Sequence, residues 1–453
     1  MAHRLDEQPR ARPNVGDELE LTIDSLAFGG AGVARSEGYV VFVDGAFPGD
    51  RVRARIHHRK RHFAQARAVE LIEPGPDRVP ARADHPGAPW QELAYERQLE
   101  IKQSQVEDAL RRIGHLDGFT LHPIVPAQEL WRYRNKLEYS FGTGEHGELV
   151  LGFHAPGSWE QIVPISDCLL ASEPANAARQ AAFDWSRASG LPAFDRRTHR
   201  GFLRNLVVRE GRRTGELQVR LVTADGELDT ASLAAAVPVQ SLLWTRTDAL
   251  AETSQGGATE LVAGAYKINE EIGGLRVAIS PDAFFQTNTE MAERLYALAA
   301  AAADLHGWER VFDLFCGTGT IGLSLAGRAG TVHGLEIVPE AVADAIANAS
   351  ENEIANASFY AGDVRLAMRE LTELAGRPDV LIVDPPRAGL SQKVVRRIIE
   401  SSPKRIVYVS CNPTTLAPNA AQLAEAGWRL EQVSPVDMFP QTPHIECVAA
   451  LSR

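Results

Sequence analysis

Cysteine and long apolar runs are the two features that this sequence has least of. Neither is frequent enough for a disulfide-stapled or membrane-spanning protein: no run of about 18 apolar residues occurs, so we expect no transmembrane helix. Residues 1–18 are charged throughout and lack the apolar core of a signal peptide. The cysteines are too few and too scattered for a disulfide framework: Cys168, Cys316, Cys411 and Cys447. These absences favour a reduced, cytoplasmic protein with no membrane association and no obligate protein partner.

Length and charge narrow the class of protein further. The chain of 453 residues carries 47 Lys and Arg against 59 Asp and Glu, a formal net charge of −12. Because the protein is not basic over its whole surface, any contact with nucleic acid must come from a local basic surface. The chain is also too long for one hydrophobic core and suits two or three domains.

The pattern of apolar residues predicts a multidomain α/β protein. Residues 13–73 alternate apolar and polar residues between glycine-rich turns, which is typical of a small β-barrel. A proline-rich linker is expected over 74–89, followed by a central α+β domain over 90–285 with a helix at 94–114 and two hairpins. From 286 to 453, short apolar runs alternate with helical segments. This predicts a Rossmann-like domain, a parallel sheet covered by helices on both faces.

The segment VFDLFCGTGTIGLSLA predicts a cofactor site. It places a strand, a glycine-rich turn and a helix in order, with Gly317, Gly319 and Gly322 spaced as G-x-G-x-x-G. Glu336 ends the next expected strand, where a carboxylate can hold ribose hydroxyls. The arrangement suits either a dinucleotide, with its pyrophosphate at the helix N-terminus, or S-adenosylmethionine.

Three further carboxylates favour S-adenosylmethionine. Asp313 lies within the first strand, where dinucleotide folds usually keep an apolar residue. Asp363 and Asp384 follow two later strands, at the edge where ligands of open α/β sheets bind. Each carboxylate alone would also suit a helix N-cap. Together with Glu336 they make four at successive strands, which favours a methyl-donor site.

Cys411 is the candidate nucleophile among the four cysteines. It follows the apolar strand RIVYVS and precedes a helix, a setting that can lower the pKa of a thiol. A buried core cysteine would look the same in the sequence. Cys316 and Cys447 are expected to pack in the core, and Glu446 would by default be a surface carboxylate.

Five motifs resemble those of the RNA uracil-C5 methyltransferases, in the family's order and spacing over nearly the whole chain. They are FFQTN, FDLFCGTGTIG, DPPRAGL, SCNPTTL and HIECVA. The resemblance implies that Cys411 is the nucleophile and Glu446 the proton acceptor. It also implies these contacts to S-adenosylmethionine: Gln286, Phe315, Glu336, Asp384 and, less directly, Asp363. From the sequence alone, Gln286 would be a helix cap or a polar surface residue.

The implied chemistry explains why a cysteine and a base are needed together. Carbon 5 of uracil is a poor nucleophile until a thiolate adds to carbon 6 and turns the ring into an enolate. Carbon 5 can then take the methyl group, and a base must remove its proton before the thiolate leaves.

The expected barrel resembles a TRAM domain, an OB-like RNA-binding module of the family's ribosomal-RNA members. Residues 51–67 hold seven Lys and Arg and three His without one acid. Such a run is usually a solvated face, but on an OB-like barrel we expect Arg59, Lys60, Arg61 and Phe63 to follow an RNA strand. Bacterial tRNA methylators of the family often lack the barrel, so the implied substrate is 23S ribosomal RNA, with tRNA as the alternative.

Two departures from the family stand out. Many relatives bind an iron–sulfur cluster with four cysteines, but residues 83–102 contain none and only Cys168 stands at a matching position, so no cluster is expected. In addition, LAPN follows SCNPTT where relatives tend to have LARD, a change that can affect how RNA or the active-site loop is held.

Two rival functions are less consistent with these motifs. DPP resembles the motif of amino-methylating enzymes, yet Arg387 stands where an aromatic residue would be needed and Cys411 would be idle. A TRAM-bearing RNA-binding protein without catalysis would have no need for Gln286, Asp384, Cys411 and Glu446 together. The sequence therefore predicts an S-adenosylmethionine-dependent RNA (uracil-C5)-methyltransferase.

Overall fold

The computed structural model describes residues 12–249 and 256–453. By its internal contacts the chain forms two compact units. The first contains residues 12–84, 88–107 and 439–444, and the second contains the remaining described residues. Residues 439–444 belong to the first unit although they lie late in the chain. The chain then returns to the second unit for its last strand. The domain boundaries predicted from the sequence stay a proposal.

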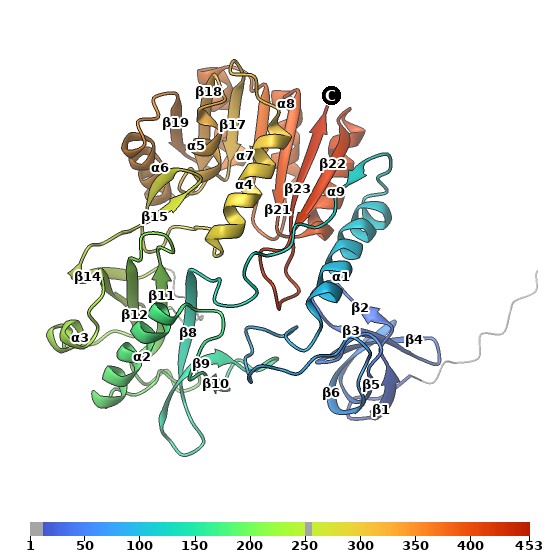
Figure 1. The fold of residues 1–453 in the computed structure, drawn as a ribbon, viewed down its shortest axis with the longest axis vertical. Helices are drawn as coiled ribbons and strands as arrows, with labels where there is room; N and C mark the ends of the chain where they lie inside the picture. The colour runs from blue at the N-terminus through green and yellow to red at the C-terminus, as the bar shows by residue number, and fades with distance from the viewer. Residues whose placement is uncertain (1–11, 250–255) are drawn as a thin grey trace, which may run out of the picture. The chain divides into compact units, whose positions relative to one another are not determined.

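The first unit contains the predicted N-terminal β-barrel, which is confirmed (Figure 1). Its strands are β1 (Glu18–Thr22), β2 (Ser25–Leu26), β3 (Gly32–Ser36), β4 (Tyr39–Asp44), β5 (Arg51–Arg59) and β6 (Phe63–Glu73). They lie in the order β1-β5-β6-β4-β3-β2. Alternate residues such as Val52, Ala54 and Ile56 of β5 are buried, whereas their neighbours face solvent. This alternation is the one that the sequence pattern predicts.

The proline-rich segment after the barrel is packed rather than free. Arg78 forms an ion pair with the fully buried carboxylate of Asp50, and Trp90 and Leu93 join an apolar cluster with Ile101. Ile101 belongs to α1 (Tyr95–Asp108), the helix that the sequence predicts near residue 94. A π-helical turn extends α1 to Ile113.

The second unit begins with a seven-stranded sheet in the order β10-β9-β8-β11-β12-β13-β14. Its strands are β8 (Lys136–Thr143), β9 (Leu149–His154), β10 (Ile162–Pro164), β11 (Leu203–Glu210), β12 (Leu217–Thr223), β13 (Ser241–Arg246) and β14 (Ala258–Gly264). The two predicted hairpins are present as the antiparallel pairs β8–β9 and β11–β12. Helices α2 (Glu173–Ala188) and α3 (Thr230–Ala236) pack beside this sheet, which makes it the expected α+β block.

A separate two-stranded hairpin and an eight-stranded sheet complete the second unit (Figure 1). The hairpin pairs β15 (Ile268–Ile272) with β16 (Leu275–Ile279). The sheet order is β19-β18-β17-β20-β21-β23-β22-β7. Its strands are β7 (Thr120–Leu121), β17 (Arg310–Leu314), β18 (Thr331–Glu336), β19 (Ala357–Ala361), β20 (Val380–Val383), β21 (Arg405–Ser410), β22 (Arg429–Val436) and β23 (Glu446–Ser452).

Six helices alternate with these strands, as the sequence predicts for a Rossmann-like domain. They are α4 (Thr289–Ala303), α5 (Thr320–Ala326), α6 (Pro339–Glu351), α7 (Val364–Ala375), α8 (Gln392–Ser401) and α9 (Pro413–Glu425). Strands β17 to β21 are parallel, but β23 runs antiparallel to both β21 and β22. The expectation of a purely parallel sheet is therefore wrong at this edge, because no helix lies between β22 and β23 to carry the chain back.

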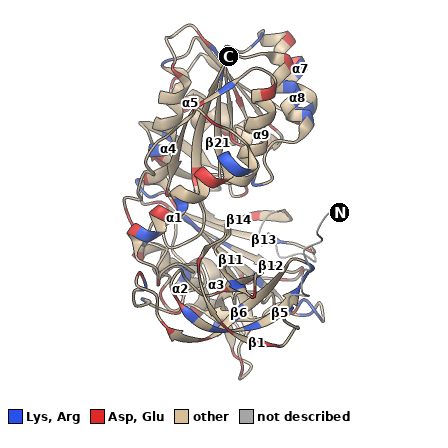
Figure 2. Ribbon diagram, turned by 90° about the vertical axis from the view of Figure 1, so that its right-hand side faces the viewer, with Lys and Arg blue, Asp and Glu red and all other residues tan. Residues whose placement is uncertain are grey.

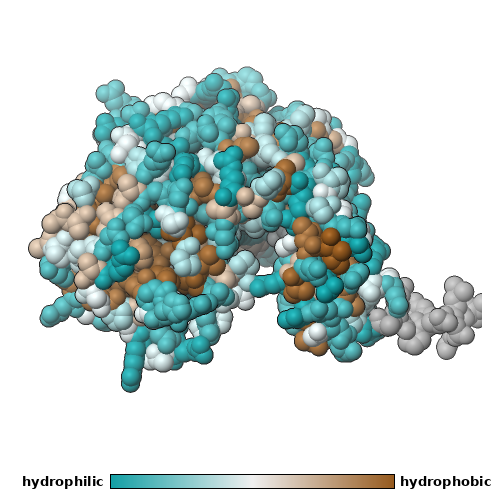
Figure 3. Space-filling model, turned by 60° about the horizontal axis from the view of Figure 1, so that its bottom comes forward, coloured by the Kyte–Doolittle hydropathy of each residue, from teal (hydrophilic) through white to brown (hydrophobic). Residues whose placement is uncertain are grey.

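Within the described ranges, no helix combines the length and the apolar character needed to cross a membrane. The surface drawn in Figure 3 is mainly hydrophilic, with apolar side chains gathered in limited areas.

Candidate active site

The glycine-rich turn after β17 has the backbone shape that its sequence requires. Phe315, Gly317 and Gly319 all adopt positive φ values, of 62°, 52° and 81°, which glycine tolerates and other residues rarely adopt. A Cβ on Gly319 would lie 2.8 Å from the ring of Phe359. Glycine is therefore required at position 319 both by the backbone conformation and by the packing against Phe359. Helix α5 begins directly after it.

Asp313 fixes this turn from inside the sheet. The side-chain Oδ2 of this fully buried residue accepts a hydrogen bond of 2.9 Å from the backbone N–H of Gly322. A Cβ on Gly322 would lie 2.8 Å from the same oxygen. Burial, together with the charges of Asp384 and Glu336, outweighs the hydrogen bond from Gly322 and raises the pKa of Asp313 to about 7. Asp313 is thus the internal support of the turn.

Two further carboxylates lie where the next strands end. Glu336, the last residue of β18, accepts hydrogen bonds from the backbone N–H groups of Gly317 and Val338, at 3.2 and 2.9 Å. Asp363 is the N-cap of α7 and also pairs with Arg365, which holds the pKa of that carboxyl below its usual range. The N-cap alternative considered for each carboxylate therefore applies to Asp363, and its contact with a cofactor stays a prediction.

Gln286 and Asp384 meet across the second unit. The Gln286 side chain is buried, not on the surface, and donates a hydrogen bond of 3.3 Å to Oδ2 of Asp384, directly after β20. The backbone oxygen of Gln286 accepts 2.8 Å from Asn135, which precedes β8. The helix cap of α4 is Asn288 rather than Gln286. Burial outweighs the bond from Gln286 and raises the pKa of Asp384 to about 7.

The register of two antiparallel strands brings Cys411 and Glu446 together. Ser410, the last residue of β21, is opposite Cys447 of β23, so the next residue along β21, Cys411, comes opposite Glu446. Glu446 is only 4% exposed, and the default expectation of a surface carboxylate is wrong. The reason is that β23 is an internal strand between β21 and β22. Cys447 is buried, as expected for a core residue, and so is Cys316.

The expected lowering of the Cys411 pKa does not occur in this structure. Burial, together with the charges of Glu446 and Asp384, raises the pKa of the Cys411 thiol to about 12, and Arg387 only partly opposes this. Burial and Asp384 also raise the pKa of Glu446 well above its usual range. The helix after Cys411 begins with Asn412 as its N-cap, but nearby carboxylates outweigh that helix terminus. The thiol of Cys411 and the carboxyls of Glu446 and Asp384 therefore lie in one buried region, where the charge of one group raises the pKa of another.

Polar side chains of α9 and of its N-cap residue, Asn412, hold the loop that carries Asp384. Asn419 accepts a hydrogen bond of 2.8 Å from the Leu390 N–H and donates one of 3.0 Å to the Leu390 oxygen. Its Oδ1 also accepts from the Tyr408 hydroxyl, at 3.1 Å. Asn412 and Thr415 donate to the backbone oxygen of Arg387. The sequence points to Asn419 only as part of the LAPN departure, whereas the structure gives it three hydrogen-bonded contacts.

Comparison with known proteins agrees with this arrangement. A profile described as tRNA (Uracil-5-)-methyltransferase matches residues 274–453, and a TRAM domain profile matches residues 12–69. An uncharacterized RNA methyltransferase of Halalkalibacterium halodurans is 38% identical over 452 residues, which cover 98% of each chain. One of Chlorobaculum tepidum is 37% identical over 484 residues, covering 100% of this chain and 99% of that protein.

The chain belongs to the RNA uracil-C5 methyltransferase family. The tRNA (uracil-54, C5)-methyltransferase of Pyrococcus abyssi, solved with S-adenosyl-L-homocysteine, has the same fold. It superposes with a TM-score of 0.79 at 28% identity, covering 96% of this chain and all of that one. The protein is therefore an S-adenosylmethionine-dependent RNA methyltransferase with an RNA-binding TRAM domain.

The residues of the methyltransferase domain fit S-adenosylmethionine. A cavity of about 260 Å³ lies at the carboxyl ends of the parallel strands, lined by Phe315, Ile337 and Asp363 among others. Apolar surfaces of this kind suit an adenine, and carboxylates beside them suit its amino group and the ribose hydroxyls. A Cβ added to Gly317 would meet no atom nearer than 3.9 Å, so the turn is open beside the cavity. The bound cofactor supplies an electrophilic methyl group.

The basic run of the TRAM domain divides into two parts. Arg51, Arg53 and Arg55 of β5 form ion pairs with acids of the neighbouring strands, Glu73, Glu70 and Glu18; Figure 2 shows both charge signs along these strands. The positive charge of these three arginines is thus largely balanced. The sequence of residues 51–67, which contains no acid, does not show this because the balancing acids lie on other strands. At the β5–β6 hairpin, Arg59, Lys60 and Arg61 are exposed, and the Lys60 amine lies 5.8 Å from the centre of the Phe63 ring. RNA binding by these four residues stays a prediction.

Cys168 lies in a buried contact of its own. Its Sγ is 3.3 Å from Nε2 of His85, and the His85 ring lies 5.4 Å from that of Phe153. Trp90 and Leu93, which follow His85 in the chain, join the apolar cluster of the first unit. Among the described residues, His85 rather than Trp90 connects this segment with Cys168.

Proposed function

We propose that this enzyme methylates carbon 5 of a specific uridine through a covalent bond between Cys411 and carbon 6 of the base. The observation that carries the proposal is the pairing of Cys411 with the buried carboxyl of Glu446 at adjoining strand ends. A thiol and a carboxyl are the two groups that this reaction needs beside the same ring.

The steps assign one role to each side chain. The Cys411 thiolate adds to carbon 6, and the electron pair moves to make carbon 5 nucleophilic. Carbon 5 takes the methyl group, after which the Glu446 carboxylate removes the carbon 5 proton and the bond between carbon 6 and sulfur breaks. The thiolate is returned unchanged, so the one proton that the reaction releases leaves through Glu446.

The raised pKa of the Cys411 thiol adds a requirement to these steps: the thiolate must form before it can add to carbon 6. A thiol with a pKa near 12 is almost entirely protonated at neutral pH, so RNA binding must favour the thiolate. A substrate phosphate would oppose this, whereas Arg387, which already lowers the pKa of both Cys411 and Glu446, would support it.

RNA that contains 5-fluorouridine tests the covalent step. Fluorine at carbon 5 cannot leave as a cation, so the enzyme should form a stable adduct that survives denaturing electrophoresis. Cys411→Ala should abolish both the adduct and turnover, a loss of at least about 10⁴-fold for removal of a nucleophile. Normal turnover by Cys411→Ala would refute the mechanism.

The identity of the target RNA is a separate proposal. The TRAM domain supports 23S ribosomal RNA, as argued from the sequence, whereas the Pyrococcus abyssi enzyme of similar length is named for uridine 54 of tRNA. Mapping 5-methyluridine in ribosomal RNA and tRNA from a deletion strain separates the two. Loss of a methyl group from 23S RNA alone would support the proposal, and loss from tRNA alone would overturn it.

A further inference from the structure

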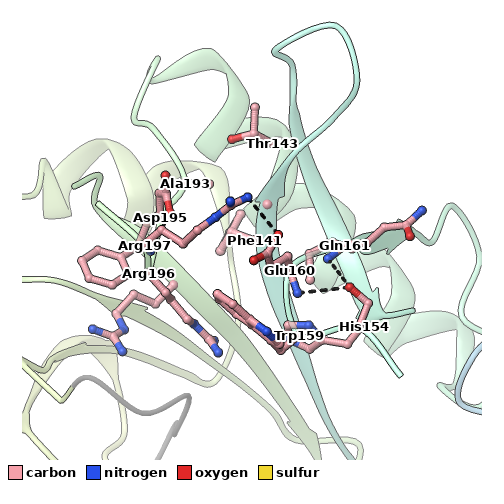
Figure 4. Close-up of a pocket in the computed structure, with 15 residues that line it drawn as sticks. Phe141, Thr143, His154, Trp159, Glu160, Gln161, Ala193, Asp195, Arg196 and Arg197 are labelled. Atoms are coloured by element: carbon pink, nitrogen blue, oxygen red, sulfur yellow. Dashed lines mark hydrogen bonds and ion pairs between the residues drawn. The ribbon is translucent and has the colours of Figure 1, made fainter. Parts of the chain in front are cut away.

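The central domain contains a cavity that has no part in the chemistry described above. Its volume is about 550 Å³, and it lies where β8 ends, beside the segment between β9 and β10 (Figure 4). Residues 158–162 and residues 193–197 line it from two loops, and Arg204 of β11 lines it as well. The volume is in the range of pockets that hold small ligands.

An exposed tryptophan is the first unusual feature of this cavity. Trp159 lines it with 55% of its surface exposed, although a tryptophan that only supports the fold is largely buried. Phe141, Ile162 and Phe194 provide further apolar surface around it. A flat aromatic face beside apolar walls suits a planar ring stacked on Trp159.

A local excess of positive charge is the second feature. Residues 195–204 read DRRTHRGFLR, with four arginines and one histidine against a single acid, in a chain whose net charge is −12. Arg197 forms an ion pair of 2.9 Å with Glu160. Arg204 lies over the ring of Phe194 at 4.4 Å, and its guanidinium donates to the oxygen of Ala249. Arg196 and Arg197 line the cavity from the loop before β11, and Arg204 lines it from β11 itself.

We propose that this cavity binds one unpaired nucleotide of the RNA substrate, with the base stacked on Trp159 and the phosphate beside Arg196. Stacking on an aromatic ring next to a basic strand is how proteins hold single-stranded RNA without reading its sequence. Figure 4 shows Trp159 and Arg196 at the same cavity from two different loops. The proposal rests on RNA being the substrate, and it does not depend on the covalent step at Cys411.

The nucleotide in this cavity is a different one from the target uridine. Asn135, next to the first residue of β8, contacts Gln286 in the catalytic region, whereas the cavity begins at Phe141. At about 3.3 Å per strand residue, six residues separate the two places by about 20 Å. The cavity therefore adds affinity for RNA outside the reacting base and takes no part in the methyl transfer.

Substitution of Trp159 tests the site in the full-length enzyme. Binding of fluorescein-labelled single-stranded oligouridine, measured by anisotropy, should weaken about tenfold in Trp159→Ala and less in Trp159→Phe, since one stacked base contributes an effect of this size. Trp308→Ala is the matched control, because Trp308 is similarly exposed, at 60% against 55% for Trp159, but lies on the methyltransferase domain. Arg196→Gln should reduce the salt dependence of binding by about one phosphate contact.

The outcomes separate this site from the catalytic proposal. Labelled S-adenosylmethionine should bind to Trp159→Ala as to the unchanged enzyme, which shows that the variant is folded. Equal RNA affinity in Trp159→Ala and Trp308→Ala would overturn the proposal. Adduct formation with 5-fluorouridine RNA at saturating RNA should persist in Trp159→Ala, so a failure of the Cys411 mechanism would leave the binding result unaffected.

Discussion

The carboxylates at the two ends of the methyltransferase site differ in their hydrogen-bond partners. At the cofactor end, Asp313, Glu336 and Asp363 each accept a hydrogen bond from at least one backbone N–H group. At the substrate end, beside Cys411, Glu446 has a buried carboxyl next to the thiol. Asp384, a predicted cofactor contact whose charge acts on both Asp313 and Cys411, accepts a hydrogen bond from the amide of Gln286.

The difference agrees with the proposal that the cofactor end is shaped in advance and that Glu446, at the substrate end, transfers the proton. Carboxylates tied to backbone N–H groups hold a turn in the geometry that a cofactor needs. Burial raises the pKa of Glu446 and Asp384, and it raises that of Asp313 as well. The proposed proton transfer is therefore assigned to Glu446 by its place beside Cys411 and not by a raised pKa alone. Raised pKa values in a cleft are the expected property of a general base.

Removing the Glu446 carboxylate should have the largest effect in this comparison. Glu446→Gln should still attack and methylate RNA once, then stall as a covalent enzyme–RNA species, so steady-state turnover should fall by about 10²- to 10⁴-fold. Single-turnover methyl transfer and denaturing electrophoresis measure the two steps separately. Failure to bind RNA, or normal turnover, would contradict the assignment.

The same variant should change the reactivity of Cys411 in the absence of RNA. Ionised Glu446 raises the pKa of Cys411, and glutamine carries no charge, so the pKa should fall in Glu446→Gln. The rate of alkylation by iodoacetamide should then rise at a lower pH than in the unchanged enzyme. Mass spectrometry of the Cys411 peptide across about pH 7–10, below the pKa near 12 of the thiol in the unchanged enzyme, measures the shift. A profile at unchanged or higher pH would show that the two groups do not interact.

Asn419 connects the substrate end to α9, and its loss should have an intermediate effect. Asn419→Asp introduces an acid that accepts but cannot donate a hydrogen bond to the Leu390 oxygen, so the loop carrying Asp384 should loosen. We expect kcat/KM to fall about tenfold, the effect of about one hydrogen bond, and Asn419→Ala to lose more. Unfolding by heat in parallel separates loop positioning from general destabilisation. Equal kcat/KM in Asn419→Asp and the unchanged enzyme would refute the positioning role.

The two halves of the basic barrel run should differ by a smaller, salt-dependent amount. Replacing Arg59, Lys60 and Arg61 by alanine should raise the KM for long RNA several-fold and flatten its salt dependence by up to about three phosphate contacts. The matched control replaces Arg51, Arg53 and Arg55, whose charges are already paired with acids. Affinity for S-adenosylmethionine should stay constant in both. Equal effects of the two triple variants would show that the hairpin is an ordinary solvated surface with no specific role in RNA binding.

Cys168 belongs neither to the cofactor end nor to the substrate end of the site, so its substitution should have the smallest effect. Cys168→Ser changes volume little and keeps a polar atom near His85, so stability should change by less than about 1.5 kcal/mol and activity should be retained. Protein purified without oxygen is expected to be colourless and free of iron, because one cysteine cannot replace four cluster ligands. Stoichiometric iron, or loss of activity in Cys168→Ser, would contradict this prediction.

The sequence alone was sufficient wherever the evidence is local. Alternation of apolar residues predicts β5 and β6, and the glycine spacing after β17 predicts a turn whose φ values only a few residues adopt. The order of strands and helices from Arg310 to Ser410 follows from the same reasoning, because each element has its own hydrophobic pattern. The family also follows from contiguous motifs such as DPPRAGL and SCNPTTL.

Only the tertiary structure decided what depends on residues far apart in the chain. Glu446 became a buried partner of Cys411 because β23 runs antiparallel between β21 and β22. The thiol pKa rose instead of falling because that register adds a carboxyl and burial, which outweigh the helix terminus beside Cys411. Likewise, Arg51 is balanced by Glu73 from another strand. Hydrophobic periodicity describes one strand at a time, whereas charge and burial depend on its neighbours across the sheet.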